Sequence, residues 1–181
     1  MYSPIQITSS YSKNNLGKTL YETILELKPL KVIEFGCLYG YSTVSIALAL
    51  KQLGRGKIYC YDLWESYEYK HTTLEETKRN LENHDLSEYV EFKHQDYYEW
   101  LREPEPFDLL HLDISNTGDT IAKTYEAVPN GSTVIFEGGS KQRDDVEWMK
   151  TYKYTPINSV KEKVGYKVLN SNWPSISIFT K

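Results

Sequence analysis

The sequence predicts an α/β fold built on a mainly parallel sheet of about seven strands, with helices on both faces. Strand patterns alternate with helix patterns along most of the chain, which is typical of parallel strands joined by helical crossovers. Only a short loop separates the last two strand patterns, so they favour an antiparallel hairpin at the end of the sheet. In addition, an acidic residue stands at the carboxyl end of each of the first five strands.

Composition and charge indicate an ordinary globular chain. Of the 181 residues, 40% are hydrophobic and 25% are charged, which allows a sizeable core. The formal net charge is -4 and the basic residues are scattered among acids, which disfavours nucleic acid as a partner. A small basic patch around Lys141 and Arg143 remains compatible with the sequence. No apolar run approaches the roughly 20 residues that span a bilayer, and the first residues lack a secretory pattern. We therefore expect a cytoplasmic protein without membrane contact, and buried reduced thiols at Cys37 and Cys60.

The first half of the chain predicts three helices and three strands. Leu16, Leu20 and Ile24 recur at helical spacing, and Pro29 stops that helix. Thr73 and Glu76 have the spacing of a capping box, which predicts the start of a later helix. We expect helices over 16–27, 42–53 and 73–83, and strands over 31–35, 57–61 and 89–94.

The second half continues the alternation and then loosens. Pro129, Asn130 and Gly131 close one helix before the fifth strand. We expect helices over 96–101, 120–128 and 144–150, and strands over 107–112, 132–136, 165–169 and 175–180.

The positions of the acids give the first functional indication. Parallel strands end at one edge of the sheet, and open α/β sheets bind ligands in the crevice there. A single acid after a strand is also explained by capping of the next helix, but five in register favour a binding edge. The five residues are Glu34, Asp62, Asp96, Asp113 and Glu137.

A glycine turn follows the first strand and leads directly into a helix. Gly36 and Gly40 allow a tight turn and a close approach to a ligand, and the helix amides favour an anionic group. The spacing differs from G-x-G-x-x-G, which disfavours an NAD-dependent oxidoreductase. The triplet 17–19, Gly-Lys-Thr, lacks both the upstream glycine and the preceding strand of a P-loop.

Asp62 ends the second strand at the place where a ribose is held in related architectures. Its two carboxylate oxygens suit the two hydroxyls of a ribose and repel a 2′-phosphate. The sequence therefore predicts a ligand that contains a nucleoside and whose other part meets the glycine turn.

The segment 32–50, VIEFGCLYGYSTVSIALAL, resembles the first motif of class I S-adenosylmethionine-dependent methyltransferases. The similarity is greatest to the O-methyltransferases of the catechol and caffeoyl-CoA type. It continues through KIYCYD at 57–62, the pair Gln95-Asp96, FDLLHLD at 107–113 and NGSTVIFEGG at 130–139. The resemblance implies a Rossmann-like methyltransferase fold in one domain over 1–181. Within it we expect an N-terminal helical segment (1–30), a cofactor-binding core (31–139) and a C-terminal helix and hairpin (140–181).

The resemblance also implies roles for individual residues toward S-adenosylmethionine. Asp62 would hold the ribose hydroxyls, with Leu63 or Trp64 on the adenine face. Asp113 would lie beside the transferred methyl group. The methionine end would be lined by the turn residues Glu34, Gly36, Cys37, Gly40 and Ser42, and the adenine amino group would meet Gln95 and Asp96.

The sequence matches only part of the metal site found in the metal-dependent members of this O-methyltransferase group. Those enzymes bind a divalent cation with an Asp after the fourth strand and an Asp-Asn pair after the fifth. Here Asp113 is present, but the fifth strand ends in Glu137-Gly138-Gly139. Asp113 and Glu137 could hold Mg²⁺ with added waters, and the rival interpretation is that metal dependence has been lost.

Methyl transfer needs a base, and the candidate catalytic residues are Asp113, Glu137 and His111. His111 lies inside a strand, two positions before Asp113, which favours a buried supporting role. The loops 64–71 and 170–174 would shape the pocket. Since no substrate domain is inserted, the pocket would be open or completed by a partner subunit, as in a homodimer.

The acceptor is the least determined part. The sequence Asp113-Ile114-Ser115-Asn116 lacks the Asn/Asp-Pro-Pro-aromatic motif of enzymes that methylate adenine or glutamine nitrogen. An oxygen of a small molecule, a sugar or a polyketide-like product is therefore favoured. The alternative is a non-catalytic module that binds S-adenosylmethionine and acts through a partner. The tyrosines Tyr67, Tyr69, Tyr97 and Tyr98 suit either an ordinary surface or an aromatic wall around a planar ligand.

Overall fold

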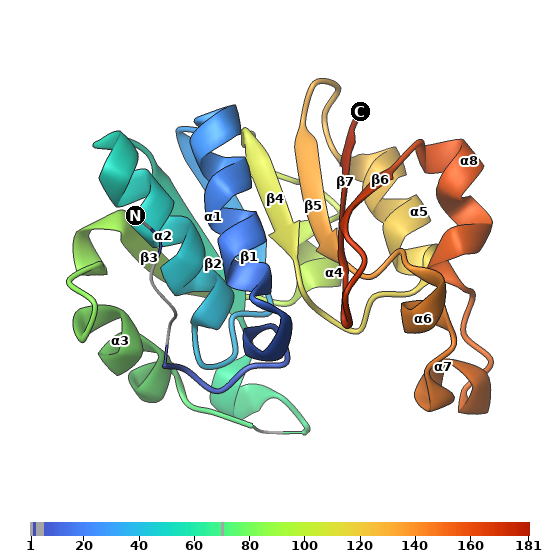
Figure 1. The fold of residues 1–181 in the computed structure, drawn as a ribbon, viewed down its shortest axis with the longest axis horizontal. Coiled ribbons are helices and arrows are strands. Elements are labelled where there is room, and N and C mark those ends of the chain that lie inside the picture. The colour runs from blue at the N-terminus through green and yellow to red at the C-terminus, as the bar shows by residue number, and fades with distance from the viewer. Residues whose placement is uncertain (1, 3–5, 70) are drawn as a thin grey trace.

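A seven-stranded sheet with the order β3-β2-β1-β4-β5-β7-β6 forms the centre of the molecule (Figure 1). The computed structural model describes residues 2, 6–69 and 71–181. Neighbours among β1 to β5 are parallel, whereas β7 lies antiparallel between β5 and β6. The predicted sheet, with its antiparallel C-terminal hairpin, is thereby confirmed. The strands are β1 (Lys31–Phe35), β2 (Lys57–Asp62), β3 (Val90–His94), β4 (Leu109–Leu112), β5 (Thr133–Glu137), β6 (Lys167–Asn170) and β7 (Ile176–Thr180).

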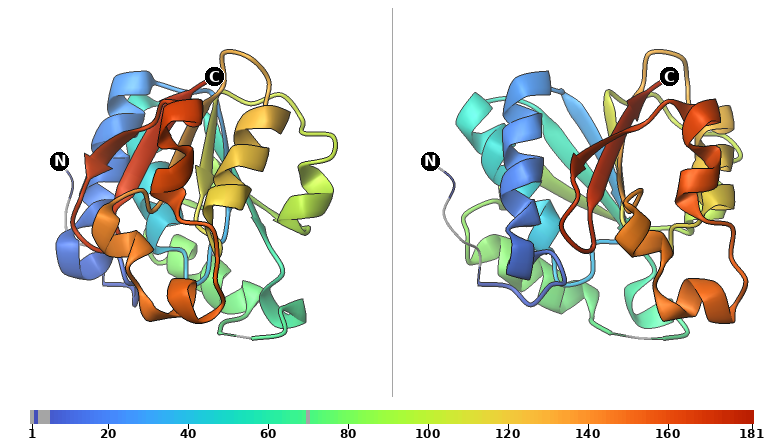
Figure 2. Two further views of the ribbon diagram at one scale, coloured as in Figure 1. Left: turned by 90° about the vertical axis from the view of Figure 1, so that its right-hand side faces the viewer. Right: turned by 45° about the vertical axis from the view of Figure 1, so that its right-hand side comes forward.

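Helices cover both faces of the sheet (Figure 2). Successive side chains of a strand point to opposite faces, so Val32 of β1 packs with α1 and α2 while Ile33 and Phe35 pack with α4 and α5. The helices are α1 (Leu16–Leu27), α2 (Tyr41–Leu53), α3 (Leu74–Glu82), α4 (Tyr97–Trp100), α5 (Gly118–Ala127), α6 (Lys141–Asp144), α7 (Glu147–Thr151) and α8 (Lys161–Val164). In the part of the chain that the structure describes, no helix is long and apolar enough to cross a membrane.

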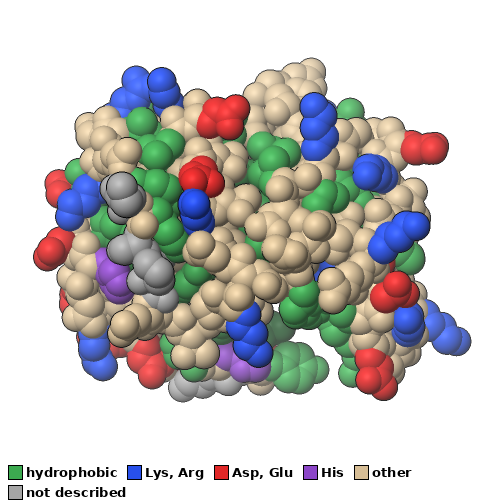
Figure 3. Space-filling model, viewed as in Figure 1, with side chains coloured by type: hydrophobic (Ala, Val, Ile, Leu, Met, Phe, Trp, Pro, Cys, Tyr) green, Lys and Arg blue, Asp and Glu red, His purple; other side chains and the backbone are tan. Residues whose placement is uncertain are grey.

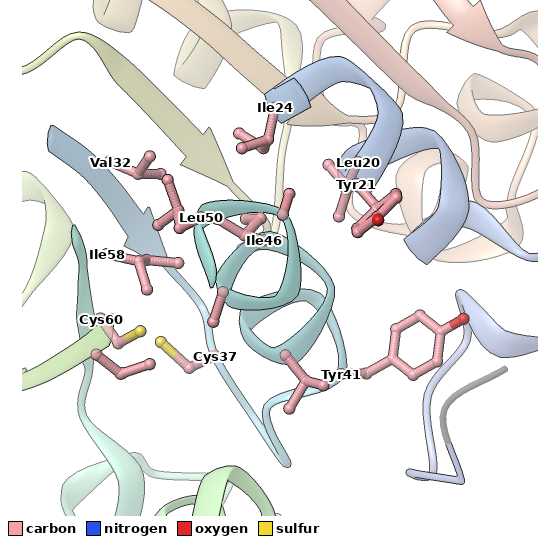
Figure 4. Packing of buried hydrophobic residues seen from close by; sticks show 14 of the residues in the cluster. Leu20, Tyr21, Ile24, Val32, Cys37, Tyr41, Ile46, Leu50, Ile58 and Cys60 are labelled. Carbon is pink, nitrogen blue, oxygen red and sulfur yellow. The ribbon is translucent and has the colours of Figure 1, made fainter. Parts of the chain in front are cut away.

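The core beneath α1 and α2 is packed from both helices and the sheet (Figure 4). Leu20 and Ile24 of α1 and Ile46 of α2 lie over Val32 and Ile58 of the sheet, all fully buried. In the same cluster the sulfur atoms of cysteines 37 and 60 point toward one another. Both cysteines are free and buried, as the sequence predicts.

Capping residues set several helix starts. At α3, Thr73 accepts from the Glu76 amide and Glu76 accepts from the Thr73 amide, which is the predicted capping box. Asp96 caps α4 through the amides of Tyr98 and Glu99. These caps fix where the chain leaves the carboxyl edge of the sheet.

The predicted helix over 144–150 is wrong in extent. The structure has two short helices, α6 and α7, with Val146 in an extended conformation between them. The Asp144 carboxylate accepts the amides of Ile157 and Asn158, both at 2.8 Å, and thereby draws the next segment against the end of α6. That segment, a 3-10 turn (Ile157–Val160) followed by α8, is not among the elements expected from the sequence.

Gly36 brings the turn after β1 into contact with the backbone after β4. It has a φ of +86°, and a Cβ at this position would lie 1.9 Å from the carbonyl oxygen of Asp113. The Asp113 amide in turn donates to the carbonyl oxygen of Phe35 at 2.9 Å. Only glycine allows this approach, because both the positive φ and the missing Cβ are needed.

We therefore expect Gly36→Ala to lower the free energy of unfolding by more than about 3 kcal/mol, since it adds a backbone clash to the positive φ. Gly54→Ala is the matched control: Gly54 also has a positive φ, +65°, but nothing lies within 4 Å of its added Cβ. It should cost only about 1 kcal/mol. Urea unfolding followed by circular dichroism measures both. Equal losses would show that the close contact at Gly36 has no energetic consequence.

Candidate functional site

A cavity of about 500 Å³ opens at the carboxyl ends of β1, β2 and β4. Five segments line it: the glycine turn, the residues after β2, the residues after β3, the residues after β4 and part of the N-terminal segment, Thr8 to Ser10. All five strand-end acids lie at this edge of the sheet, but only Asp62, Asp96 and Asp113 line the cavity. The structure thus separates the predicted site residues into those that face the cavity and those behind its wall.

Asp62 fastens the glycine turn to the end of β2. Its Oδ2 atom accepts the backbone amides of Cys37 at 2.7 Å and Leu38 at 3.1 Å. Its Oδ1 atom accepts those of Leu63 at 2.7 Å and Trp64 at 3.2 Å. A carboxylate has about four lone-pair sites, so all are engaged, two toward each neighbouring segment. One side chain therefore sets the relative position of two walls of the cavity.

The glycine turn is shaped by both of its glycines. The Gly36 amide donates to the carbonyl oxygen of Tyr61 at 3.2 Å. Gly40 has a φ of +87° and begins α2, and a Cβ there would approach Leu81 to 2.9 Å. Gly36, Cys37 and Ser42 line the cavity, whereas Gly40 supports the turn from outside. Burial raises the pKa of the Cys37 thiol well above its ordinary value, which keeps it protonated and unreactive.

The other end of the cavity offers an apolar surface beside polar groups. Leu63, Trp64, Gln95 and Asp96, the residues expected near an adenine, all line it. The indole N–H of Trp64 is buried and has no hydrogen-bond partner among residues 2, 6–69 and 71–181. Of the four tyrosines considered for an aromatic wall, Tyr67, Tyr97 and Tyr98 contribute to the lining, and Tyr69 lies outside it.

Glu34 and His111 form a pair behind the cavity. They are register partners on β1 and β4, and both are fully buried. His111 Nδ1 lies 2.9 Å from Glu34 Oε1, and the Thr43 hydroxyl donates to Glu34 Oε2. Glu34 was expected at the methionine end, and His111 was a candidate base for which a buried supporting role was favoured; neither lines the cavity in this structure. We therefore assign both a supporting role beneath the floor of the site.

Asp113 is one of the three strand-end acids that line the cavity, and its backbone lies against Gly36 of the glycine turn. Burial raises the pKa of its carboxyl group to about 6; the neighbouring His111 opposes this rise and Glu34 reinforces it. The Tyr11 hydroxyl also favours the ionised form of Asp113, although within the described residues it has no hydrogen bond of good geometry. Asp113 is thus poised to exchange a proton near neutral pH.

Glu137 is held away from the cavity by Arg143. The guanidinium binds both carboxylate oxygens, Nε to Oε1 and Nη2 to Oε2 at 2.9 Å, and both side chains are buried. Burial raises the pKa of the Glu137 carboxyl and Arg143 opposes that rise. Both oxygens of Glu137, which was expected as a base or a metal ligand, are therefore engaged by the guanidinium. The residues present do not fit a divalent cation at this place.

The described residues do bring three potential ligand atoms together elsewhere, at Glu34, Cys37 and Cys60. Burial raises the pKa of both thiols, and metal binding requires thiolates. This cluster is part of the hydrophobic core and does not provide a metal site. The small basic patch considered at Lys141 and Arg143 does not form either, because Arg143 is buried. On the face drawn in Figure 3, basic and acidic side chains are interspersed.

Sequence reasoning missed three contributors to the site. Tyr11 and the segment Thr8 to Ser10 precede the first recognisable pattern, so no periodicity indicated their position. Arg143 was noted only for its charge. Its pairing with Glu137 depends on the way the chain turns back after β5, and the glycines at 138 and 139 were the available signal.

The sheet order, the antiparallel β7 and the cavity at the ends of β1, β2 and β4 together define a Rossmann-like methyltransferase. A family model described as a methyltransferase domain matches residues 33–137, which is more than half of the chain. The chain therefore belongs to this methyltransferase family. No curated protein matches the sequence.

Solved structures share the fold at low sequence identity. The O-methyltransferase TomG from Streptomyces achromogenes, determined in complex with S-adenosylmethionine, has 15% identity and a TM-score of 0.63, with 92% of this chain and 80% of that chain covered. A methyltransferase from Podospora anserina bound to S-adenosylhomocysteine has 14% identity and a TM-score of 0.64, covering 96% and 80%. A methyltransferase from Geobacter sulfurreducens has 14% identity and a TM-score of 0.65, covering 98% and 80%.

The buried pair gives a stability prediction. We expect His111→Leu to cost about 3 kcal/mol of unfolding free energy, because it leaves the Glu34 carboxylate buried without its partner. The double variant Glu34→Gln/His111→Leu should recover part of this loss, since it removes the unpaired charge as well. Urea unfolding of both variants provides the measurement. A stable His111→Leu variant would contradict the supporting role.

Proposed function

We propose that this protein transfers the methyl group of S-adenosylmethionine to an oxygen atom of a small molecule or sugar. The observation that carries the proposal is the joint geometry of the glycine turn and Asp62. Both face one cavity, and the Asp62 carboxylate is hydrogen-bonded to the amides of Cys37 and Leu38 in that turn. Family membership supports methyl transfer, and the acceptor is inferred from the lining of the cavity.

The donor set fits each part of S-adenosylmethionine. A volume of about 500 Å³ lies within the usual range of small-molecule sites. Each Asp62 oxygen holds one short and one long hydrogen bond, and the long ones, to Leu38 and Trp64, are the contacts that ribose hydroxyls can displace. Leu63 and Trp64 supply an apolar surface for a purine. The side chains of Gln95 and Asp96, at the same end, suit its amino group.

The chemistry left to the chain is alignment and proton removal. When bound, S-adenosylmethionine supplies a methyl group that is already activated as a sulfonium. Asp113 is placed to accept the proton of an acceptor hydroxyl, because it faces the cavity and has a pKa of about 6. Its position is fixed by the hydrogen bond from its amide to Phe35 and by the contact of its carbonyl with Gly36. This fixed position favours an in-line arrangement.

The surroundings of Asp113 favour an oxygen acceptor. Hydroxyl groups of Thr8, Ser9, Ser10 and Ser115 line the same cavity and suit a hydroxylated ligand. Asn116, the nearby amide, is fully buried, and its Nδ2 atom donates to the carbonyl oxygens of Leu112 and Glu137 at 2.9 Å. The Asn116 side chain is therefore turned away from any methyl acceptor in the cavity. This disfavours recognition of an amino group on that acceptor.

Asp62→Ala should weaken the affinity for S-adenosylhomocysteine by about 1–3 kcal/mol, roughly 5- to 150-fold, because the ribose hydroxyls lose their acceptor. Asp108→Ala is a matched control, since Asp108 also accepts two backbone amides, those of Leu30 and Lys31, at the opposite end of β1. Isothermal titration of both variants, with folding checked by circular dichroism, tests the assignment. Equal affinities for the two folded variants would refute it.

Asp113 predicts a pH dependence. A base must be ionised, so kcat/KM should rise with pH, with an apparent pKa of about 6, and level off above pH 7. Asp113→Asn should lower kcat by about 10²–10⁴-fold while the affinity for S-adenosylhomocysteine changes less than about threefold. Initial rates between pH 5 and 8 measure the profile. A flat profile, or an active Asp113→Asn enzyme, would exclude Asp113 as the base.

One observation keeps a non-catalytic binding module as a second candidate. With Glu137 paired and His111 buried, Asp113 is the remaining candidate base at the cavity among the three named from the sequence. Incubation of fractionated metabolite extracts with a labelled methyl donor distinguishes the two functions. Label on a hydroxylated compound supports the methyltransferase. Tight cofactor binding without transfer to any fraction favours the module.

A further inference from the structure

The ion pair between Glu137 and Arg143 is built into the fold at the ends of β4 and β5. Arg143 lies on α6, six residues after Glu137, and its amide is capped by the Ser140 side chain at 3.2 Å. The guanidinium engages both oxygens of Glu137 in a fork. This arrangement is bidentate and desolvated, which gives it far more geometric specificity than a surface ion pair.

Two further contacts hold the guanidinium. Nη2 also donates to the carbonyl oxygen of Asn116, at 3.3 Å, in the loop that follows β4. The ring of Trp148 lies 4.6 Å from Cζ, a distance at which a cation and an aromatic ring attract. The Asn116 side chain donates to the carbonyl oxygen of Glu137, which links the same two loops a second time. Arg143 therefore joins the end of β5 to the loop that carries Asp113.

Gly138 makes room for this arrangement. It has a φ of +110°, and an added Cβ would lie 2.5 Å from Ile157 and 3.4 Å from the Arg143 side chain. The residue after Glu137 thus contributes space and no ligand atom. Gly138 stands where the metal-dependent O-methyltransferases that the sequence resembles carry an Asn ligand. Here the space beside it is filled by Ile157 and the aliphatic part of the Arg143 side chain.

The charge of Arg143 reaches Asp113. Asp113 raises the pKa of the Glu137 carboxyl group, and Arg143 lowers the pKa of both Asp113 and Glu137. A divalent cation between two carboxylates has the same effect. A guanidinium keeps its charge at all working pH values, and here it is held by both Glu137 oxygens, the carbonyl oxygen of Asn116 and the ring of Trp148.

We infer that Arg143 holds the place of the divalent cation, as a positioning residue for Asp113, and that methyl transfer by this protein needs no metal. This inference rests on the proposed function for its catalytic part. Its structural part, exclusion of a metal by the guanidinium, stands without any acceptor. The donor set agrees with it, because a cation could reach Glu137 only by displacing a buried ion pair.

Metal binding is the first test, with Mn²⁺ as the probe, in the presence of S-adenosylhomocysteine and followed by electron paramagnetic resonance. We expect no Mn²⁺ bound by the wild-type protein up to about 1 mM, a level at which weak sites fill. Arg143→Ala should bind Mn²⁺ at least tenfold more tightly, and Glu137→Gln added to it should abolish that gain. Stoichiometric Mn²⁺ on the wild-type protein, or no gain in Arg143→Ala, would overturn the inference.

Activity is the second test. The wild-type rate should be unchanged by EDTA and unchanged by added Mg²⁺. Arg143→Lys, which keeps the charge but loses the fork, should retain a larger share of kcat than Arg143→Met, while both bind S-adenosylhomocysteine within about threefold of wild type. Lys141→Ala, on the same helix but exposed, is the control and should be unchanged. A wild-type rate that EDTA abolishes would overturn the inference.

If Arg143→Met does not fold, the variant Glu137→Gln/Arg143→Met replaces it, because this pair of changes removes both buried charges together. A folded double variant with reduced kcat and unchanged S-adenosylhomocysteine affinity supports positioning. Wild-type kcat in that variant would reduce Arg143 to a structural role. If the wild-type protein itself does not bind S-adenosylhomocysteine, the proposed function is wrong. The Mn²⁺ titration still tests whether Arg143 excludes a metal in that case.

Discussion

The four hydrogen bonds that Asp62 accepts are the constraint on which the site depends. A glycine turn is intrinsically flexible, and its conformation must be imposed by its surroundings. Asp62 imposes it from one side through the amides of Cys37 and Leu38, and the backbone of Asp113 imposes it from the other through contact with Gly36. The ends of β1, β2 and β4 are thereby fixed relative to one another. The cavity exists because these three strand ends cannot move independently.

Buried polar groups divide the remaining tasks around Asp113. The pair Glu34–His111 lies beneath the floor, between β1 and β4, and shields one acid from the cavity. Arg143 neutralises another, Glu137, at the end of β5. Among Glu34, Asp113 and Glu137, Asp113 alone is left to face a ligand. Acids at the ends of parallel strands would repel one another if all were free, so pairing each of the others with a partner favours a single ionisable group at the reaction centre.

Most of the scaffold follows from local sequence patterns. The strand β1 has the predicted bounds, and the capping box at Thr73 sets the start of α3 as its spacing indicates. The sequence pattern does not predict the break between α6 and α7. That break depends on Asp144, which turns from its own helix to cap the segment at Ile157. Such a contact joins residues whose proximity only the folded chain determines.

In the site too, some features follow from local sequence and others depend on contacts between distant parts of the chain. The glycine turn and Asp62 could be identified because their chemistry and spacing are local and linked to one strand-helix-strand unit. The orientation of Glu34 could not, because its place in the sheet depends on pairing with His111 from a strand far along the chain. Arg143 was hidden for a similar reason. Its function depends on a reversal of the chain after Gly138, and a lone arginine after a strand has no signature of its own.

A crystal structure of the protein with S-adenosylhomocysteine tests the central claim most directly, because that claim is a spatial one. We expect ribose hydroxyls at about 3 Å from the Asp62 carboxylate, and a sulfur atom that faces Asp113. We also expect the glycine turn to keep its conformation, since the short hydrogen bond from the Cys37 amide to Asp62 and the contact of Gly36 with the Asp113 backbone hold it before a ligand binds. A ligand bound elsewhere, or a ribose that makes no contact with Asp62, would contradict the account.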